Sequence, residues 1–177
     1  MKKLMIIVAV AMAAAVSQAA SVGWSFMGAT AYASGSYDVF VLGQNGVTSQ
    51  SQIAALVAAG TAVDSYAFYS GGSIAANGAG VVQPANSGKS LTYDAEGSTA
   101  DNTYQAFIIV WDKDGKNASY TALAETTLAN NNTSKTFLFA NQSSNLSANN
   151  FSVAPEPTSG LLMLLGMAGL ALRRKRA

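Results

Sequence analysis

The residues with the clearest potential for chemistry in this 177-residue chain are the acidic and amide side chains of residues 111–117 (WDKDGKN). Asp112, Asp114 and Asn117 surround a glycine, and oxygen ligands of this kind occur in calcium-binding loops. An EF-hand loop beginning at Asp112 would need glycine at its sixth position and glutamate at its twelfth, where this chain has Asn117 and Leu123. An Asp-Gly pair between two apolar segments is instead typical of a β-hairpin, so we favour a turn over a weak calcium site and assign no metal ligand.

The composition argues against catalysis. The chain contains no histidine and no cysteine, which removes the commonest general base, the Ser-His-Asp triad, thiol chemistry and most zinc sites. Two carboxylates could still hydrolyse glycosides, but no pair stands out in the sequence. The glycine-rich residues 71–80 lack the lysine of a phosphate-binding loop and are predicted to form a flexible loop or a twisted sheet edge. We predict no enzymatic activity and no cofactor.

The charges are distributed unevenly along the chain. Six of the ten Lys and Arg residues lie in the two end segments, and the four lysines between them stand against eight acidic residues, so this middle region has a net charge of −4. Nucleic-acid binding depends on clustered Lys and Arg that displace counterions. The sequence therefore argues against nucleic acid as a partner.

The first 19 residues have the three parts of a signal peptide. Two lysines follow the first methionine, residues 4–16 form an apolar run, and Ser17 and Ala19 supply small side chains before a cleavage site. We predict cleavage by signal peptidase between Ala19 and Ala20, and therefore export. The alternative is an uncleaved membrane helix, but the apolar run is shorter than the ~20 residues that such a helix needs.

The carboxyl-terminal residues 155–177 join three parts in a fixed order. The first part is a motif made of Pro155, Glu156 and Pro157. The second is an apolar run that comprises Ser159, Gly160, Leu161, Leu162, Met163, Leu164, Leu165, Gly166, Met167, Ala168, Gly169, Leu170, Ala171 and Leu172. The third is a basic stop made of Arg173, Arg174, Lys175 and Arg176. As a helix the apolar run would extend about 21 Å, which is short for a stable transmembrane span, and the basic stop would stay on the cytoplasmic side.

These three parts, in this order, resemble a PEP-CTERM sorting signal. The resemblance covers the last 23 residues and implies nothing about the fold of the rest of the chain. It implies that the tail is recognised and removed by an exosortase, a membrane-embedded cysteine peptidase of Gram-negative bacteria that make exopolysaccharide. It also implies transient anchoring in the inner membrane before the protein reaches the cell surface or the extracellular matrix.

Residues 20–140 are predicted to form a β-rich exported domain, and residues 141–154 a polar spacer before the sorting signal. Aromatic and β-branched residues occur in short groups separated by Gly, Asn and Ser, as in antiparallel strands. Strands are predicted at residues 21–27, 37–42, 63–70, 89–94, 103–111, 118–123 and 135–140. We predict a mainly β fold, an antiparallel β-sandwich or flattened barrel of about seven strands, flanked by the signal peptide and a short C-terminal hydrophobic helix.

Residues 50–59 depart from the strand pattern and are predicted to form one short helix. Ser49 is the expected N-cap, Gln52 is its capping-box partner, and Gly60 is the expected stop. We expect this helix to plug an end or an edge of the sheet.

The segment 103–111 (TYQAFIIVW) is predicted to be a central strand, because it is apolar on both faces. Phe107 and Ile109 should face one layer, and Ile108 and Val110 the other.

The function predicted from these features is a structural or adhesive role in an exported protein of the cell surface or matrix. One alternative is a carbohydrate-binding module of the exopolysaccharide matrix, in which Trp24, Trp111 or several tyrosines form an exposed flat strip that stacks on sugar rings. If those rings are buried, they belong to the core instead. The other alternative is a permanently tail-anchored envelope protein, which would keep its tail.

Overall fold

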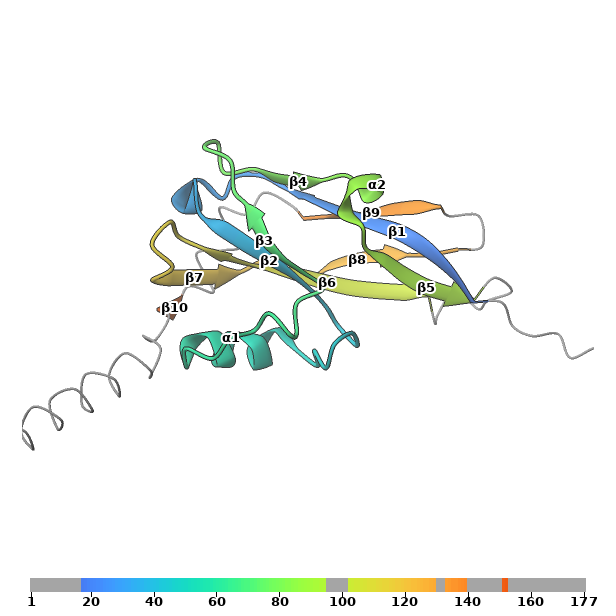
Figure 1. The fold of residues 1–177 in the computed structure, drawn as a ribbon, viewed down its shortest axis with the longest axis horizontal. Helices are drawn as coiled ribbons and strands as arrows, with labels where there is room; N and C mark the ends of the chain where they lie inside the picture. The colour runs from blue at the N-terminus through green and yellow to red at the C-terminus, as the bar shows by residue number, and fades with distance from the viewer. Residues whose placement is uncertain (1–16, 95–101, 130–132, 140–150, 153–177) are drawn as a thin grey trace, which may run out of the picture.

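Two β-sheets packed face to face, with a helix on the outer side of the second sheet, make up the part of the chain that the computed structural model describes (Figure 1). The described residues are 17–94, 102–129, 133–139 and 151–152. The first sheet contains β1 (Ser17–Phe26), β4 (Gly80–Val82), β5 (Ser90–Asp94) and β9 (Ser134–Leu138). The second sheet contains β2 (Ser36–Val41), β3 (Tyr69–Ser73), β6 (Thr103–Trp111), β7 (Asn117–Tyr120), β8 (Ala124–Thr127) and β10 (Phe151–Ser152). The helical elements are the 3-10 helix η1 (Thr30–Tyr32) and the α-helices α1 (Gln50–Ala58) and α2 (Pro84–Ser87).

The two sheets are organised around β1 and β6. β1 pairs antiparallel with β4 and β5 along one side and parallel with β9 along the other. The second sheet has the order β10-β7-β6-β2-β3, and β8 also pairs with β6. The prediction of a mainly β sandwich with a short helix is confirmed. Ten strands are described where about seven were expected, because β4, β8 and β10 are only two to four residues long.

The main core lies between the two sheets. Trp24 of β1 is fully buried there, and its indole Nε1 donates a 2.9 Å hydrogen bond to the hydroxyl of Tyr37 on β2. The Tyr37 ring lies against Gly72 of β3, where any Cβ would overlap it. A glycine at this position therefore lets a buried aromatic ring pack directly onto the backbone of the edge strand β3.

A second apolar cluster lies on the other face of the second sheet, beneath α1. Phe40 and Phe107 pack there against Ile53 and Val57 of the helix. Ile109 of β6 belongs to this cluster, whereas its neighbours on the same strand, Ile108 and Val110, belong to the core between the sheets. The prediction that β6 is a central strand covered on both faces is therefore confirmed.

The helix α1 begins at the predicted residue, Gln50, and ends at Ala58, one residue before the predicted end. Ser49 Oγ accepts a hydrogen bond from the Gln52 backbone N, and Gly60 has a φ of +70°, as a C′ glycine should. The capping box is incomplete, since the Gln52 side chain accepts hydrogen bonds from Thr48 instead of from Ser49. The expected position of the helix was wrong: it covers the face of the second sheet, because its apolar side packs on that face, and it does not plug an end or an edge.

The predicted strand at residues 63–70 is wrong over most of its length. Tyr66 and Ala67 donate backbone hydrogen bonds to Val63 O, so this segment turns, and β3 begins only at Tyr69. β3 then continues through the first glycines of residues 71–80 as the last strand of its sheet. The apolar residues there belong to a loop that buries Val63 and Phe68, and pattern alone does not distinguish such a loop from a strand.

Candidate functional site

The sorting-signal residues predicted from the sequence lie outside the described part of the chain. This applies to the Pro-Glu-Pro motif, the apolar run and the basic stop, and also to residues 4–16 of the signal peptide. The predicted cleavage site does fall within the described residues. Ala19 is exposed and Ala20 buried, both in β1, and Gln18 accepts a 3.0 Å hydrogen bond from the Tyr93 hydroxyl of β5. Cleavage after Ala19 would shorten β1 by three residues and would leave its buried part in place.

The chain returns to the folded domain immediately before the sorting signal. β10 pairs antiparallel with β7 at the edge of the second sheet, with Phe151 opposite Ala118 and Ser152 opposite Asn117. Of the predicted polar spacer, residues 141–154, the structure describes only residues 151–152, which form this short strand. Only two residues separate β10 from Pro155.

The turn between β6 and β7 is a hairpin, as the Asp-Gly pair predicts. Gly115 has a φ of +66°, and its backbone N donates to Asp112 O at 3.0 Å. The Asp112 carboxylate accepts hydrogen bonds from the backbone N of Lys116 and from Asn117 Nδ2. Slight burial raises the pKa of Asp112, but these hydrogen bonds outweigh that effect and hold the pKa below its ordinary value. The carboxylate thus stabilises the turn.

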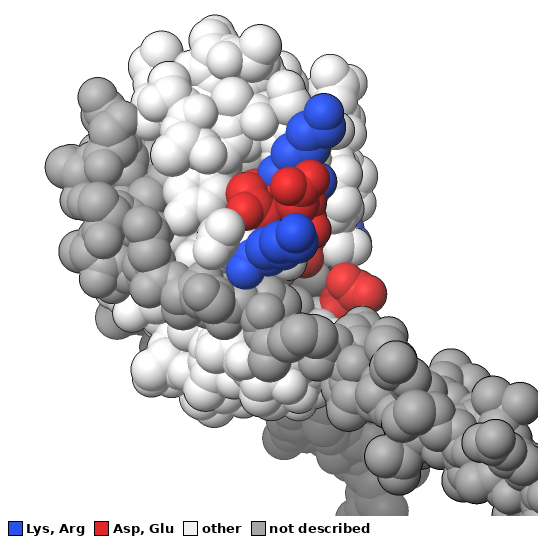
Figure 2. Space-filling view, turned by 90° about the vertical axis from the view of Figure 1, so that its left-hand side faces the viewer, with Lys and Arg blue, Asp and Glu red and all other residues white. Residues whose placement is uncertain are grey.

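Basic and acidic side chains gather in a mixed group at the end of the molecule where this hairpin lies, with a further acidic side chain below it, and most other described residues on that face are uncharged (Figure 2). Lysines and acidic residues alternate within the turn sequence DKDGK, so the charges there offset one another. Within the described ranges, no three His, Cys, Asp or Glu side chains lie close enough together to hold a metal ion.

The exposed aromatic strip expected of a carbohydrate-binding module is not formed by Trp24, which is 0% exposed. Its ring lies 4.7 Å from that of Tyr69 and belongs to the core between the sheets. Trp111, in contrast, is only partly buried and lies at the end of β6 on the outer face of the second sheet. The two tryptophans therefore have different roles, which their local sequences do not reveal.

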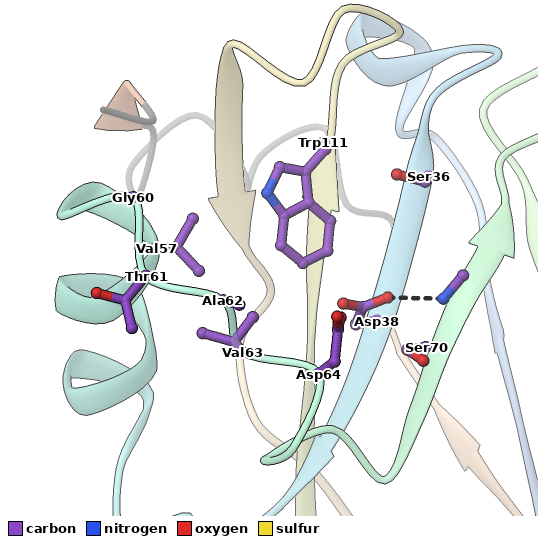
Figure 3. Close-up of a pocket in the computed structure, with 11 residues that line it drawn as sticks. Ser36, Asp38, Val57, Gly60, Thr61, Ala62, Val63, Asp64, Ser70 and Trp111 are labelled. Atoms are coloured by element: carbon purple, nitrogen blue, oxygen red, sulfur yellow. Dashed lines mark hydrogen bonds between the residues drawn. The ribbon is translucent and has the colours of Figure 1, made fainter. Parts of the chain in front are cut away.

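A pocket of about 460 Å³ opens on this outer face, beside α1 (Figure 3). β2 contributes Ser36 and Asp38, β6 contributes Trp111, β3 contributes Ser70, and the loop after α1 contributes Asp64. The pairing of β2 with β6 brings Ser36, Asp38 and Trp111 together, since Ser36 lies opposite Trp111 and Asp38 lies opposite Ile109. The volume is within the range of roughly 300–1,000 Å³ that small-molecule sites occupy.

Asp38 is the most unusual side chain in this pocket, because it is a carboxylate that is only 7% exposed. The backbone N of Gly71 donates a 2.8 Å hydrogen bond to Asp38 Oδ1. Within the described part of the chain, no hydrogen bond is found for Oδ2. A buried carboxylate with one unsatisfied oxygen is costly and is a recognised sign of a functional site.

The electrostatic environment of Asp38 disfavours its charged form. Burial raises the pKa of Asp38 to about 6; the hydrogen bond from Gly71 opposes this shift, and the negative charge of Asp64 adds to it. Figure 3 shows the carboxyl groups of Asp38 and Asp64 side by side, between the indole of Trp111 and β3. Among the described residues that line the pocket, there is no lysine or arginine.

Sequence reasoning missed this site. Asp38 and Asp64 lie on different elements, so in the sequence they stand out only as two of the middle region's negative charges. One signal was available: Asp38 interrupts the apolar run YDVFVL in a strand that is otherwise buried on both faces. A charge in such a strand needs a partner or a functional reason.

Comparison with known proteins identifies the tail and nothing else. Residues 153–176 match the model of the PEP-CTERM protein-sorting motif. This motif implies export, transient anchoring at the membrane and processing by an exosortase. No curated protein and no solved structure matches the chain. Among the residues that the structure describes, no helix combines the length and the apolar character needed to cross a membrane.

Proposed function

We propose that this protein is a non-enzymatic structural or adhesive component of the cell surface or extracellular matrix of a Gram-negative-type bacterium. The observation that supports this most directly is the PEP-CTERM motif at residues 153–176, joined to a β-sandwich in a chain that has no histidine or cysteine. Signal peptidase, an exosortase and exopolysaccharide are its proposed partners. The inner membrane is a transient location.

The physical properties of the tail explain how it would be sorted. Pro155 and Pro157 fix φ near −65° and lack backbone N–H groups, so they keep the segment extended and separate from the helix that follows. A peptidase cleft accepts an extended segment. The short apolar run and its basic stop would hold this segment at the outer boundary of the membrane, within reach of a membrane enzyme.

Replacing both tail prolines with alanine is expected to block processing without preventing membrane insertion. The helix could then extend outward through Glu156 and hide the scissile region, so unprocessed protein should accumulate in the membrane. Cell fractionation and intact-mass analysis in cells that contain the peptidase would measure this. Pro84→Ala changes the remaining proline of the chain, in α2, and should be processed like wild type. Identical fractionation and mass for the double variant and wild type would favour a permanent tail anchor instead.

The mature chain is expected to begin at Ala20. Ala19→Phe should block signal-peptide cleavage, because the −1 position requires a small side chain, whereas Gln18→Phe at the unrestricted −2 position should still be cleaved. Both side chains are exposed in β1, so neither replacement should disturb the core. Intact-mass analysis of exported protein tests this directly. Wild-type mature protein that retained Met1 would show that the signal-peptide assignment is wrong.

Polysaccharide binding is a second candidate function. The specific observation in its favour is Trp111, a partly exposed indole at a pocket that also holds carboxyl and hydroxyl groups. Sugar sites commonly combine an aromatic face with convergent polar groups.

A further inference from the structure

We infer that the pocket formed by Asp38, Asp64 and Trp111 binds a sugar residue that carries a free, positively charged amino group. The inference rests on the proposed surface or matrix location, because it names the part of the matrix polysaccharide that the protein would recognise. Neither the PEP-CTERM motif nor any other comparison assigns a ligand to this part of the chain.

The balance of charge in the pocket favours a cationic ligand. Two carboxyl groups lie side by side, and none of the described lining residues is a lysine or arginine. Burial disfavours the charged form of Asp38, and the negative charge of Asp64 adds to this effect. An ammonium group between them would offset both charges. A uronic acid would add a third negative charge and would be repelled.

The second carboxyl oxygen of Asp38 can accept a hydrogen bond from a ligand. Its Oδ1 is held by Gly71 N at 2.8 Å, which fixes the orientation of the carboxyl group, and no hydrogen bond to Oδ2 is found among the described residues. An ammonium group offers three donors, and a charge-assisted hydrogen bond is roughly twice as strong as a neutral one. The pocket therefore offers a ligand amine a rigid, preorganised acceptor.

The pocket also has an aromatic side chain in its lining. The Trp111 indole borders the same pocket as the two carboxyl groups (Figure 3). Tryptophan is the best aromatic partner for a cation, and its face also stacks on the C–H face of a sugar ring. The hydroxyl groups of Ser36 and Ser70 lie at the pocket as further hydrogen-bonding groups for sugar hydroxyls.

A cation such as calcium fits the pocket less well. Calcium takes 6–8 oxygen ligands in its usual sites. Only two carboxylates are present here, and no metal-binding group of three is found in the described ranges. An aromatic ring does not supply the oxygen ligands that calcium takes, whereas it can stack on the ring of an amino sugar.

The test uses the purified full-length chain in mild detergent and isothermal titration calorimetry at neutral pH. The probes are a β-1,4-linked glucosamine oligomer, its fully N-acetylated counterpart and a glucuronate oligomer of the same length. The glucosamine oligomer should bind about tenfold or more tightly than the acetylated one, because acetylation removes the charge that the carboxylates recognise. The glucuronate oligomer should not bind.

Three variants then locate the site. Asp38→Asn and Trp111→Ala should each weaken binding about tenfold or more. Glu125→Gln removes one carboxylate from the exposed side of β8, outside the pocket, and should bind like wild type. Because Asp38→Asn keeps the shape of the side chain and an acceptor for Gly71 N, it should remain folded, as a thermal unfolding scan would verify.

Several results would overturn the inference. The first is equal affinity for the acetylated and the free-amine oligomers, and the second is no binding of either oligomer. The third is an equal loss of affinity in Glu125→Gln and Asp38→Asn, because it would indicate nonspecific attraction between opposite charges. If the tail is processed as proposed but the oligomer does not bind, only this inference fails. If the glucosamine oligomer binds to a protein whose tail is never processed, the sorting proposal fails and the proposed ligand is still supported.

Discussion

Replacing Phe107 by alanine is expected to lower the free energy of unfolding by about 3–5 kcal/mol. Phe107 is 0% exposed, and its ring stacks on that of Phe40 with centroids 5.2 Å apart. It also meets the edge of Tyr120 and packs beneath α1. Truncation would leave a cavity between the second sheet and the helix, where both layers are held by the strands around them and cannot collapse fully.

A loss of this size would approach the whole stability of a domain, which is typically about 5–15 kcal/mol. Urea denaturation of the variant and wild type would measure it. Leu138→Ala is the matched control, because Leu138 lies on β9 with 72% of its surface exposed and should change stability by no more than about 0.5 kcal/mol. A loss below about 1 kcal/mol for Phe107→Ala would show that the cluster beneath α1 is loosely packed.

The position of Phe107 shows what the sequence could predict about the fold. A nine-residue strand that is apolar at every position from Ala106 to Val110 has to be covered on both sides, and the structure places a sheet on one side and α1 on the other. The helix itself could be predicted from Ser49 and Gly60, because caps are local interactions. The face on which the helix lies is a tertiary property and was predicted wrongly.

The pairing of strands could not be predicted for the same reason. β1 and β9 are more than 100 residues apart and run parallel, although all strands were expected to be antiparallel. β10 has only two residues, so its attachment to β7 depends on a free edge and not on any pattern of its own. Short strands carry too little periodicity to be recognised.

The candidate site was only partly predictable. Trp111 was among the aromatic residues proposed to contact sugar, but Trp24, proposed with the same argument, is core. The pocket exists because the pairing of β2 with β6 brings Asp38 close to Trp111, and because the loop after α1 folds back over them with Asp64. Such convergence of distant segments is set by topology, which a single sequence does not reveal.

Replacing Asp38 by asparagine is expected to stabilise the protein at pH 8 by about 2–3 kcal/mol, since each unit of pKa shift corresponds to about 1.4 kcal/mol. The pKa of Asp38 is raised from its ordinary value of 3.8 to about 6, and burial is the largest cause. The folded state therefore holds the proton more tightly than the unfolded state. Between these two pKa values the unfolded chain is ionised and the folded chain is not, so stability falls as the pH rises from about 4 to about 6 and stays lower above that.

Asparagine resembles the protonated acid in shape and charge and can still accept the hydrogen bond from Gly71 N. The gain should therefore be nearly full above pH 6, small at pH 4, and absent at lower pH, where Asp38 is protonated in both the folded and the unfolded state. Urea denaturation of both proteins at pH 4 and pH 8 would measure the difference, with Glu125→Gln as the control for loss of one exposed carboxylate. An equal gain at both pH values, or a loss at pH 8, would contradict the assignment. A substitution that stabilises the fold but removes ligand binding is the signature of a residue kept for function, because a buried, unsatisfied carboxylate has no structural advantage over its amide here.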